Sequence, residues 1–271
     1  MPEKMNPGPV QGSACIREAV CVHTKKIYDS CKDKDCIEDL RFYPTQNSQP
    51  VIDRALSVRA GKAELLYVAI DVEPVGFNKG FYTIDVRYFY RVTADAFVGA
   101  ARPVEVTGLC IFDKRVLLFG GEGSAKIFSS NLVIDGIDEQ KMQKNNTPIA
   151  YVEAVDPIVL GIKLVDVCDC RPCCECDTAD VPPCICACFG CDLSFGNECK
   201  RILVTLGQFS IIRLERDSQL LIPVYDYCLP EKDCAASGGD EDDPCEIFRS
   251  VKFPVDEFFP SDGTNSCSCK C

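Results

Sequence analysis

Cysteine thiols are the side chains of this sequence best able to do chemistry, and they are concentrated in one place. The segment 168–191, CDCRPCCECDTADVPPCICACFGC, holds nine of the 21 cysteines in a chain of 271 residues. Thiolates bind soft metal ions, act in redox catalysis and form covalent links between segments or chains. Spacing within the segment, and the rest of the chain, must decide between these three kinds of site.

Metal binding is the first alternative. A structural zinc site typically has two C-x2-C pairs separated by about a dozen residues or more. Cys170/Cys173 and Cys188/Cys191 form two such pairs, with fourteen residues between them. Dense cysteines generate this spacing by chance, so zinc or soft-metal binding at these four residues remains an alternative hypothesis. A ferredoxin-type run is missing from the sequence, which argues against an iron–sulfur cluster.

Disulfide cross-linking is the second alternative, and the spacing favours it. If CICAC is extended, Cys184, Cys186 and Cys188 point to one face with Cα atoms about 6.5–7 Å apart, at or beyond disulfide reach. Adjacent cysteines such as Cys173 and Cys174 bond each other only with strain. The tail CSCKC ends at Cys271, on a chain terminus well placed to reach a neighbour.

We therefore expect bonds from these segments to other segments or other chains. Because 21 is odd, a metal-free monomer also leaves at least one cysteine free or bonded to another chain. The predicted cross-linking or disulfide residues are Cys15, Cys21, Cys31, Cys36, Cys168, Cys170, Cys173, Cys174, Cys176, Cys184, Cys186, Cys188, Cys191, Cys199, Cys228, Cys234, Cys245, Cys267, Cys269 and Cys271.

Catalysis has little support in the sequence. A redox C-x-x-C site needs a helix N-terminus, usually in a βαβ unit, and no such pattern is visible. The single histidine, His23, has no recognisable nucleophile or carboxylate partner. The glycine-rich FGGEGSAK lacks the lysine and hydroxyl pattern of a phosphate-binding loop. We expect no enzymatic activity, no catalytic residues and no cofactor.

The segments that position the thiols are predicted to be β-strands. In FYTIDVRYFYRV (81–92) apolar and polar residues alternate, which predicts a strand with one buried face. AELLYVAIDVEP (63–74) shows the same period, whereas CIEDLRF (36–42) is compatible with a short helix. Further strand candidates are PVEVTGLCIF, KRVLLFG, AKIFSSNLVI, VLGIKLVDV, ILVTLGQFSIIRLE and LLIPVYDY. The fold class predicted is mainly β: an antiparallel β-sandwich or barrel-like domain with a cysteine-rich insertion and cysteine-containing N- and C-terminal arms.

The cysteine distribution predicts the domain organisation. Residues 1–50 form an N-terminal cysteine-containing arm, and residues 51–227 form the β domain. Residues 168–199 are a cysteine-rich insertion between two strands of that domain. Residues 228–271 form an acidic, cysteine-containing tail.

Charge and the N-terminal sequence restrict partners and compartment. A net charge of −12 disfavours binding to nucleic acid or anionic membranes, and no apolar run is long enough for a membrane span. The segment MPEKMNPGPVQGSACIREAV has prolines and glycine where a signal peptide needs an apolar core. We expect synthesis in a reducing cytoplasm, where disulfides rarely persist, and oxidation afterwards.

The segment CVHTKKIYDSCKDKDCIEDLRFYP, the CDCRPCCEC cluster and the CSCKC end together resemble the cysteine-rich spore-surface (exosporium) proteins of clostridia. The resemblance implies synthesis in the mother-cell cytoplasm without a signal peptide and self-assembly into a two-dimensional lattice on the spore, locked by disulfides upon oxidation. Its partners would be other copies of the chain, in cyclic rings packed in a plane, together with other spore-surface proteins. No catalytic residues carry over.

Overall fold

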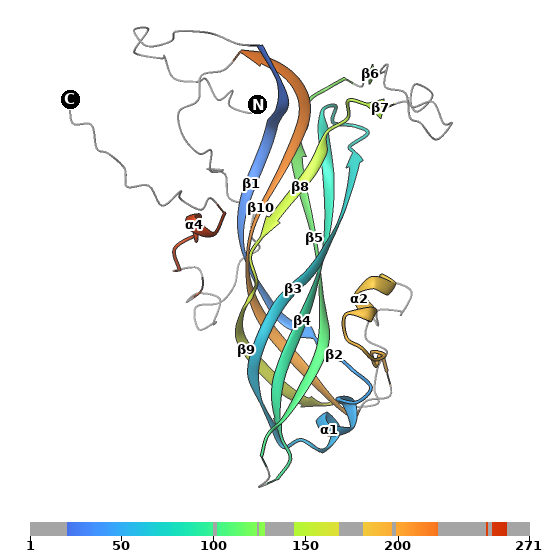
Figure 1. Ribbon diagram of the computed structural model, residues 1–271, viewed down its shortest axis with the longest axis vertical. Coiled ribbons are helices and arrows are strands. Elements are labelled where there is room, and N and C mark those ends of the chain that lie inside the picture. The colour runs from blue at the N-terminus through green and yellow to red at the C-terminus, as the bar shows by residue number, and fades with distance from the viewer. Residues whose placement is uncertain are drawn as a thin grey trace, which may run out of the picture.

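The computed structural model describes residues 21–99, 102–123, 125–127, 144–167, 181–196, 199–221, 248 and 251–258. Its elements are β1 (Cys21–Arg41), β2 (Tyr43–Pro44), α1 (Gln49–Arg54), β3 (Ser57–Pro74), β4 (Phe81–Phe97), β5 (Val104–Phe119), β6 (Lys126–Ile127), β7 (Lys144–Asn145), β8 (Ile149–Ala154), β9 (Ile158–Asp166), α2 (Pro183–Ala187), β10 (Lys200–Leu221) and α4 (Val255–Phe258). The molecule is an elongated bundle of long strands (Figure 1).

Two antiparallel four-stranded sheets make up the body. In the first, β10 is the central strand: β1 pairs with one edge along nearly its whole length, and β8 and β9 pair with the other. In the second, the order is β2-β5-β4-β3. The prediction of a mainly β, antiparallel fold is confirmed. The short strands β6 and β7 pair with each other.

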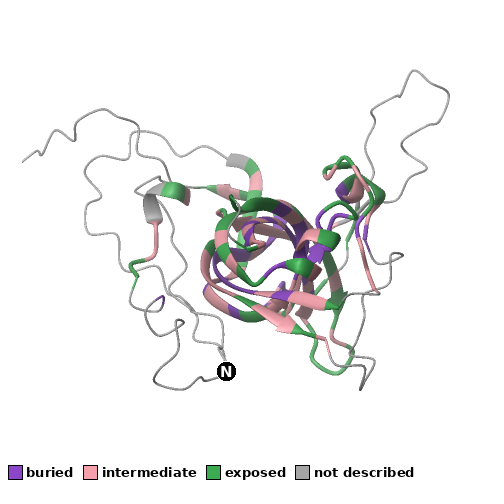
Figure 2. Ribbon diagram, turned by 90° about the horizontal axis from the view of Figure 1, so that it is seen from below, coloured by how far each residue is buried: buried purple, intermediate pink, exposed green. Residues whose placement is uncertain are grey.

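The two sheets curl around a common interior, as the view along the molecule shows (Figure 2). At the edges where the sheets meet, side chains bridge the strands. The Asp29 carboxylate accepts a hydrogen bond from the Phe119 N–H at 3.1 Å, between β1 and β5. On the opposite side, the Asp156 carboxylate accepts one from the Leu65 N–H of β3 at 2.8 Å. We call the first of these edges the β1–β5 seam.

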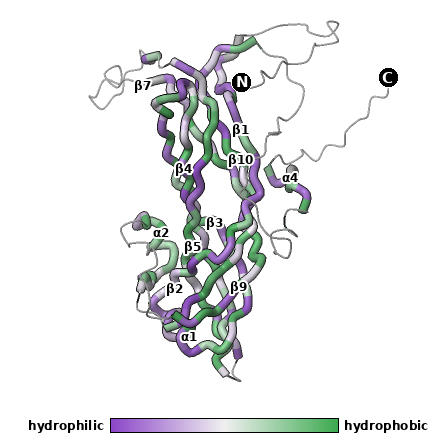
Figure 3. The backbone as a smooth tube through the Cα atoms, turned by 180° about the vertical axis from the view of Figure 1, so that it is seen from behind, coloured by the Kyte–Doolittle hydropathy of each residue, from purple (hydrophilic) through white to green (hydrophobic). Residues whose placement is uncertain are grey.

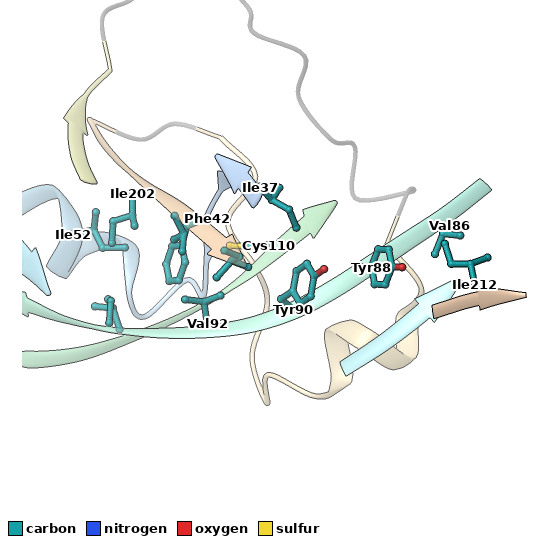
Figure 4. Close-up of a cluster of buried hydrophobic side chains, with 14 of the residues drawn as sticks. Ile37, Phe42, Ile52, Val86, Tyr88, Tyr90, Val92, Cys110, Ile202 and Ile212 are labelled. Carbon is teal, nitrogen blue, oxygen red and sulfur yellow. The ribbon is translucent and has the colours of Figure 1, made fainter. Parts of the chain in front are cut away.

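The interior is built from the inward faces of β1, β4, β5 and β10. The even-numbered residues of β4 face inward, as the alternating sequence pattern predicts. Those buried in the interior include Ile84, Val86, Tyr88, Tyr90 and Val92. Figure 4 shows the last four of them, from Val86 to Val92, beside Cys110 of β5 and Ile212 of β10. Hydrophobic and hydrophilic residues alternate along the strands in Figure 3. Burial of this apolar surface is the main force that holds the sheets together.

The structure differs from the expected organisation at the N-terminal side. Residues 21–41, assigned to an arm that ended at residue 50, form β1 and belong to the first sheet. The helix considered for CIEDLRF (36–42) is wrong, because residues 36–41 continue β1 and pair with β10, with a register shift between Ile37 and Leu40. Pairing with a central strand outweighs local helix preference here. The segments 103–112 and 114–120, expected as separate strands, form most of one long strand, β5.

Part of the C-terminal region lies on the outer face of the first sheet. Phe248 packs on Phe209 of β10, with ring centroids 4.6 Å apart, and Phe253 meets the same ring edge-on. Lys34 of β1 donates a hydrogen bond to the Val251 carbonyl at 2.8 Å. Among the described helices, none has the length and apolar character needed to cross a membrane.

Candidate cross-linking site

The cysteine-rich insertion begins and ends at neighbouring points of the first sheet. β9 ends at Asp166, which pairs with Lys200 at the start of β10, and the Val167 N–H donates to the Cys199 carbonyl at 2.9 Å. The length and sequence of the insertion can therefore change without disturbing the strands that flank it. Of its residues, the structure describes 181–196 and Cys199, and we call residues 181–196 the flap.

The flap packs against the outer face of the second sheet, beside β2, β4 and β5 (Figure 1). Its apolar residues Val181, Ile185 and Leu193 are buried in a small second core against Phe89 and Leu109. Backbone hydrogen bonds join it to the chain after β1. The Ser194 N–H donates to the Pro44 carbonyl at 2.7 Å, and the Gln46 N–H donates to the Asp192 carbonyl at 2.9 Å.

Within the flap, CICAC is helical rather than extended. Proline occupies the first position of α2, where its fixed φ suits a helix and its missing N–H costs nothing. Gly190, with a φ of 67°, turns the chain back after the helix. In a helix Cys184 and Cys188 share one face, which is exposed, while Cys186 packs against the second core. The expectation that all three thiols share one face assumed an extended segment, and it does not apply because the segment is helical.

Arg91 of β4 fixes the end of α2. Its guanidinium donates to the Cys188 carbonyl at 2.8 Å, pairs with Glu64 at 3.0 Å, and lies over the Phe189 ring. The buried second core and this arginine hold Cys184 and Cys188 on a supported helix. Their thiols are free and exposed, which is the condition for attack on a disulfide of a partner.

The other described cysteines divide into three groups. Cys199 is free and exposed, and Cys191 is free and partly buried. Cys31 and Cys36 are each disulfide-bonded. They lie on one strand, roughly 17 Å apart, beyond disulfide reach, so each bonds a different cysteine of the chain.

Cys110 forms the third group. It is free but completely buried, and burial raises the pKa of its thiol; it is not among the predicted cross-linking residues. The remaining predicted cross-linking residues lie outside the described residues: Cys15, Cys168, Cys170, Cys173, Cys174, Cys176, Cys228, Cys234, Cys245, Cys267, Cys269 and Cys271. The side chain of Cys21 is likewise not described.

The four cysteines of the alternative zinc hypothesis fall in two parts of the insertion. Cys188 and Cys191 are in the flap, but Cys170 and Cys173 are outside the described residues. In the part of the chain that the structure describes, no three His, Cys, Asp or Glu residues gather closely enough to hold a metal ion. The hypothesis therefore rests on sequence spacing.

A charged cluster that the sequence did not reveal lies inside the body at the β1–β5 seam. Lys114 of β5 is 9% exposed and donates to the carboxylates of Asp33 and Asp35 on β1; its nitrogen lies 2.7 Å from the nearer Asp35 oxygen. Burial raises the pKa of Asp35 to about 6, against the attraction of Lys114 and with the repulsion of Asp33. Two carboxylates share one ammonium group here.

The surroundings of this cluster are apolar or neutral. Tyr88 of β4 faces it, and burial raises the pKa of the Tyr88 hydroxyl, with the charges of Asp35 and Asp33 adding to the effect. Ser210 and Gln208, opposite Asp33 and Asp35 in the β1–β10 register, are completely buried. The cluster is largely buried, with 9% to 16% of each side chain exposed, and it joins β1 to β5.

Comparison with known proteins gives one informative match. The chain is 27% identical over 269 residues to Exosporium protein A of Clostridium sporogenes (strain ATCC 15579), covering 92% of this chain and 78% of that protein. No protein-family model matches the sequence. No solved structure matches it either.

Proposed function

We propose that this chain is a structural protein of the bacterial spore surface that self-assembles into a two-dimensional lattice. Disulfides between neighbouring copies then lock that lattice. The observation that carries the proposal is the pair of free, exposed thiols of Cys184 and Cys188 on a flap held rigidly to the body. The similarity to a protein named for the exosporium, over 92% of the chain, supports the location.

The chemistry of the proposal follows from accessibility. During synthesis in a reducing cytoplasm the thiols stay reduced, and assembly depends on noncovalent contacts between bodies. In an oxidising exterior, a peroxide converts a thiol of one copy to a sulfenic acid. A thiolate of another copy then attacks that sulfur, the hydroxyl leaves as water, and the disulfide link forms. Cross-links across many copies remove dissociation as a route to disassembly, so the resistance of the shell becomes kinetic.

The proposal carries with it the other expectations from the sequence. The protein would be made in the mother-cell cytoplasm, would lack enzymatic activity, and would bind other copies of itself in cyclic rings packed in a plane. Other spore-surface proteins would contact the lattice. The exposed thiols of the flap support a covalent role for the insertion, whereas the zinc hypothesis has no support from the described residues.

The test is assembly of the purified protein with and without reductant. We expect planar arrays by negative-stain microscopy, and covalent multimers on nonreducing gels that disappear with reductant. The triple substitution of Cys184, Cys188 and Cys199 to serine should reduce the multimers, whereas Cys110→Ser, a buried control, should not. Soluble monomers that run identically in both gels would refute the proposal, and so would a stoichiometric metal in elemental analysis of the reduced protein.

A further inference from the structure

The outer face of the second sheet is only partly covered by the flap. Beyond the flap, along β3, β4 and β5, lies an open hollow of about 700 Å³. Four of its lining residues are oppositely charged in pairs: Asp85 and Arg87 on β4, and Arg115 and Asp113 on β5. Exposed apolar side chains lie at both ends of this face, Tyr67 on β3 and Leu117 on β5.

The four charged side chains form two cross-strand pairs in adjacent rows. Asp85 lies directly opposite Arg115, and Arg87 lies directly opposite Asp113. Both pairs are bidentate, with hydrogen bonds of 2.6 and 2.9 Å in the first and 2.6 and 3.0 Å in the second. The bonds fix the positions of the charges, while 36% to 73% of each side chain stays exposed. We call these four residues the charge square.

From this arrangement we infer that the charge square is a face-to-face contact between two copies of this chain. Positive and negative charges alternate in both directions: along each strand and across the two strands. Two copies stacked face to face can be related by a twofold axis that lies between them, parallel to the sheet. If the axis runs along the strands, it exchanges the positions of β4 and β5; if it runs across the strands, it exchanges the two rows of charges. With the axis along the strands, Asp85 of one copy faces Arg115 of the other; with the axis across them, it faces Arg87.

Either arrangement places opposite charges against each other at all four positions. The surface is therefore complementary to itself, which is the requirement for an isologous contact. The square itself holds two charges of each sign, and Asp71 of β3, directly opposite Asp85, adds one negative charge beside it. Tyr67 and Leu117 add apolar area at the margins, and the neighbouring flap shows that this sheet face accepts a packed protein segment.

This inference rests on the proposed function, because it names one of the noncovalent contacts that hold the lattice before oxidation. The contact is electrostatic and exposed, so added salt must weaken it. In reductant, sedimentation of the wild-type protein should show self-association that falls about tenfold or more between low and high ionic strength. Self-association that does not respond to salt would overturn the inference without the need for any variant.

The sharper test uses two variants of opposite charge. R87E/R115E makes the square wholly acidic, and D85K/D113K makes it wholly basic, so each variant repels itself. We expect self-association about a hundredfold weaker for each alone, since like charges across an interface are strongly unfavourable. An equimolar mixture should associate again, because the acidic square matches the basic one. The control R59E/R102E makes the same change in net charge away from the square and should associate like the wild type.

The outcomes separate this inference from the proposed function. Each variant is first compared with the wild type by circular dichroism to establish that it folds. If R87E/R115E associates as strongly as the wild type, or if the folded variants stay apart when mixed, the charge square is not the contact, while the lattice proposal stands on other surfaces. If the wild type itself remains monomeric in both reducing and oxidising solution, the proposed function fails and this inference fails with it.

Discussion

Substitution of Lys114 by methionine tests whether the buried charges at the β1–β5 seam hold the two sheets together. Methionine keeps most of the length and volume of lysine but removes its charge. Asp33 and Asp35 would then be two buried carboxylates without a cation, 9% and 16% exposed. Removing one member of a buried ion pair typically costs about 3–5 kcal/mol. We expect the free energy of unfolding at pH 7 to fall by about that amount.

The loss should depend on pH in a defined direction. The pKa of Asp35 is already raised to about 6 in the wild type, and removal of Lys114 raises it further. A raised pKa in the folded state means that the folded protein holds the proton more tightly than the unfolded chain. Stability then increases as pH falls towards the unfolded value of 3.8. At pH 5 the carboxyls of the variant take up protons, so the deficit should shrink.

The assay is urea unfolding followed by far-ultraviolet circular dichroism at pH 7 and pH 5. Arg115→Met is the matched control, because Arg115 is the next residue of β5 but its side chain is 73% exposed on the outer face. Exposed ion pairs contribute little, so this variant should resemble the wild type at both pH values. The reasoning is refuted if Lys114→Met loses no more stability than Arg115→Met, or if its deficit is unchanged at pH 5.

Three further predictions follow from other features of the structure. Asp35→Asn should remove most of the wild-type loss of stability between pH 4 and pH 7 in urea titrations. A shift from 3.8 to about 6 corresponds to about 3 kcal/mol, and an unchanged pH profile would contradict the role given to this carboxyl. Native alkylation followed by mass spectrometry should label Cys184 quickly and Cys110 only after denaturation, because one thiol is exposed and the other buried; labelling at equal rates would contradict the structure. Gly108→Ala should cost about 1–3 kcal/mol in thermal or urea unfolding, because its new Cβ would lie 2.6 Å from the Tyr43 carbonyl. Gly196→Ala, with open space around it, should cost little, and equal effects would argue against the close packing of β2 on β5.

The sequence predicts the second sheet best because its strands follow the simple rule of one buried face. Along β4, every second residue from Ile84 to Ala96 is buried, so periodicity alone identifies the strand and its inward face. The lengths of the strands were underestimated. β5 keeps its register through Asp113 and Lys114, where the charged residues looked like a break between two strands.

β1 was missed for a related reason. Its inward positions include Asp33 and Asp35. Charged residues predict a solvent-exposed face, and the sequence does not show that Lys114 of β5 pairs with both carboxylates. A buried charge requires a partner distant in sequence, and a single sequence does not show which residues meet. The only local hint was the alternation of Cys31, Asp33, Asp35 and Ile37 with lysines on the other face.

The flap was predicted in part. The cysteines indicate an insertion with thiol chemistry, but the geometry of the flap depends on its proline and aliphatic residues. The Pro182–Pro183 pair starts a helix, and Ile185 and Leu193 fix it to the sheet. The sequence therefore indicated candidate thiols, while the exposure of Cys184 and Cys188 within the flap followed only from its packing.

The long pairing of β1 with β10 has a mechanical consequence for a protein in a shell. Cys21 is the direct partner of Leu221, so β1 begins and β10 ends at the same end of the body (Figure 1). Tension that draws these two strand ends apart would peel the strands from that end, breaking one hydrogen-bonded pair at a time. Tension between that end and the flap instead acts along the strands. Many hydrogen-bonded pairs then bear the force at the same time, so the strands resist it better. The proposed lattice would therefore stretch least if its links pulled each copy between the flap and the end of the body where β1 begins.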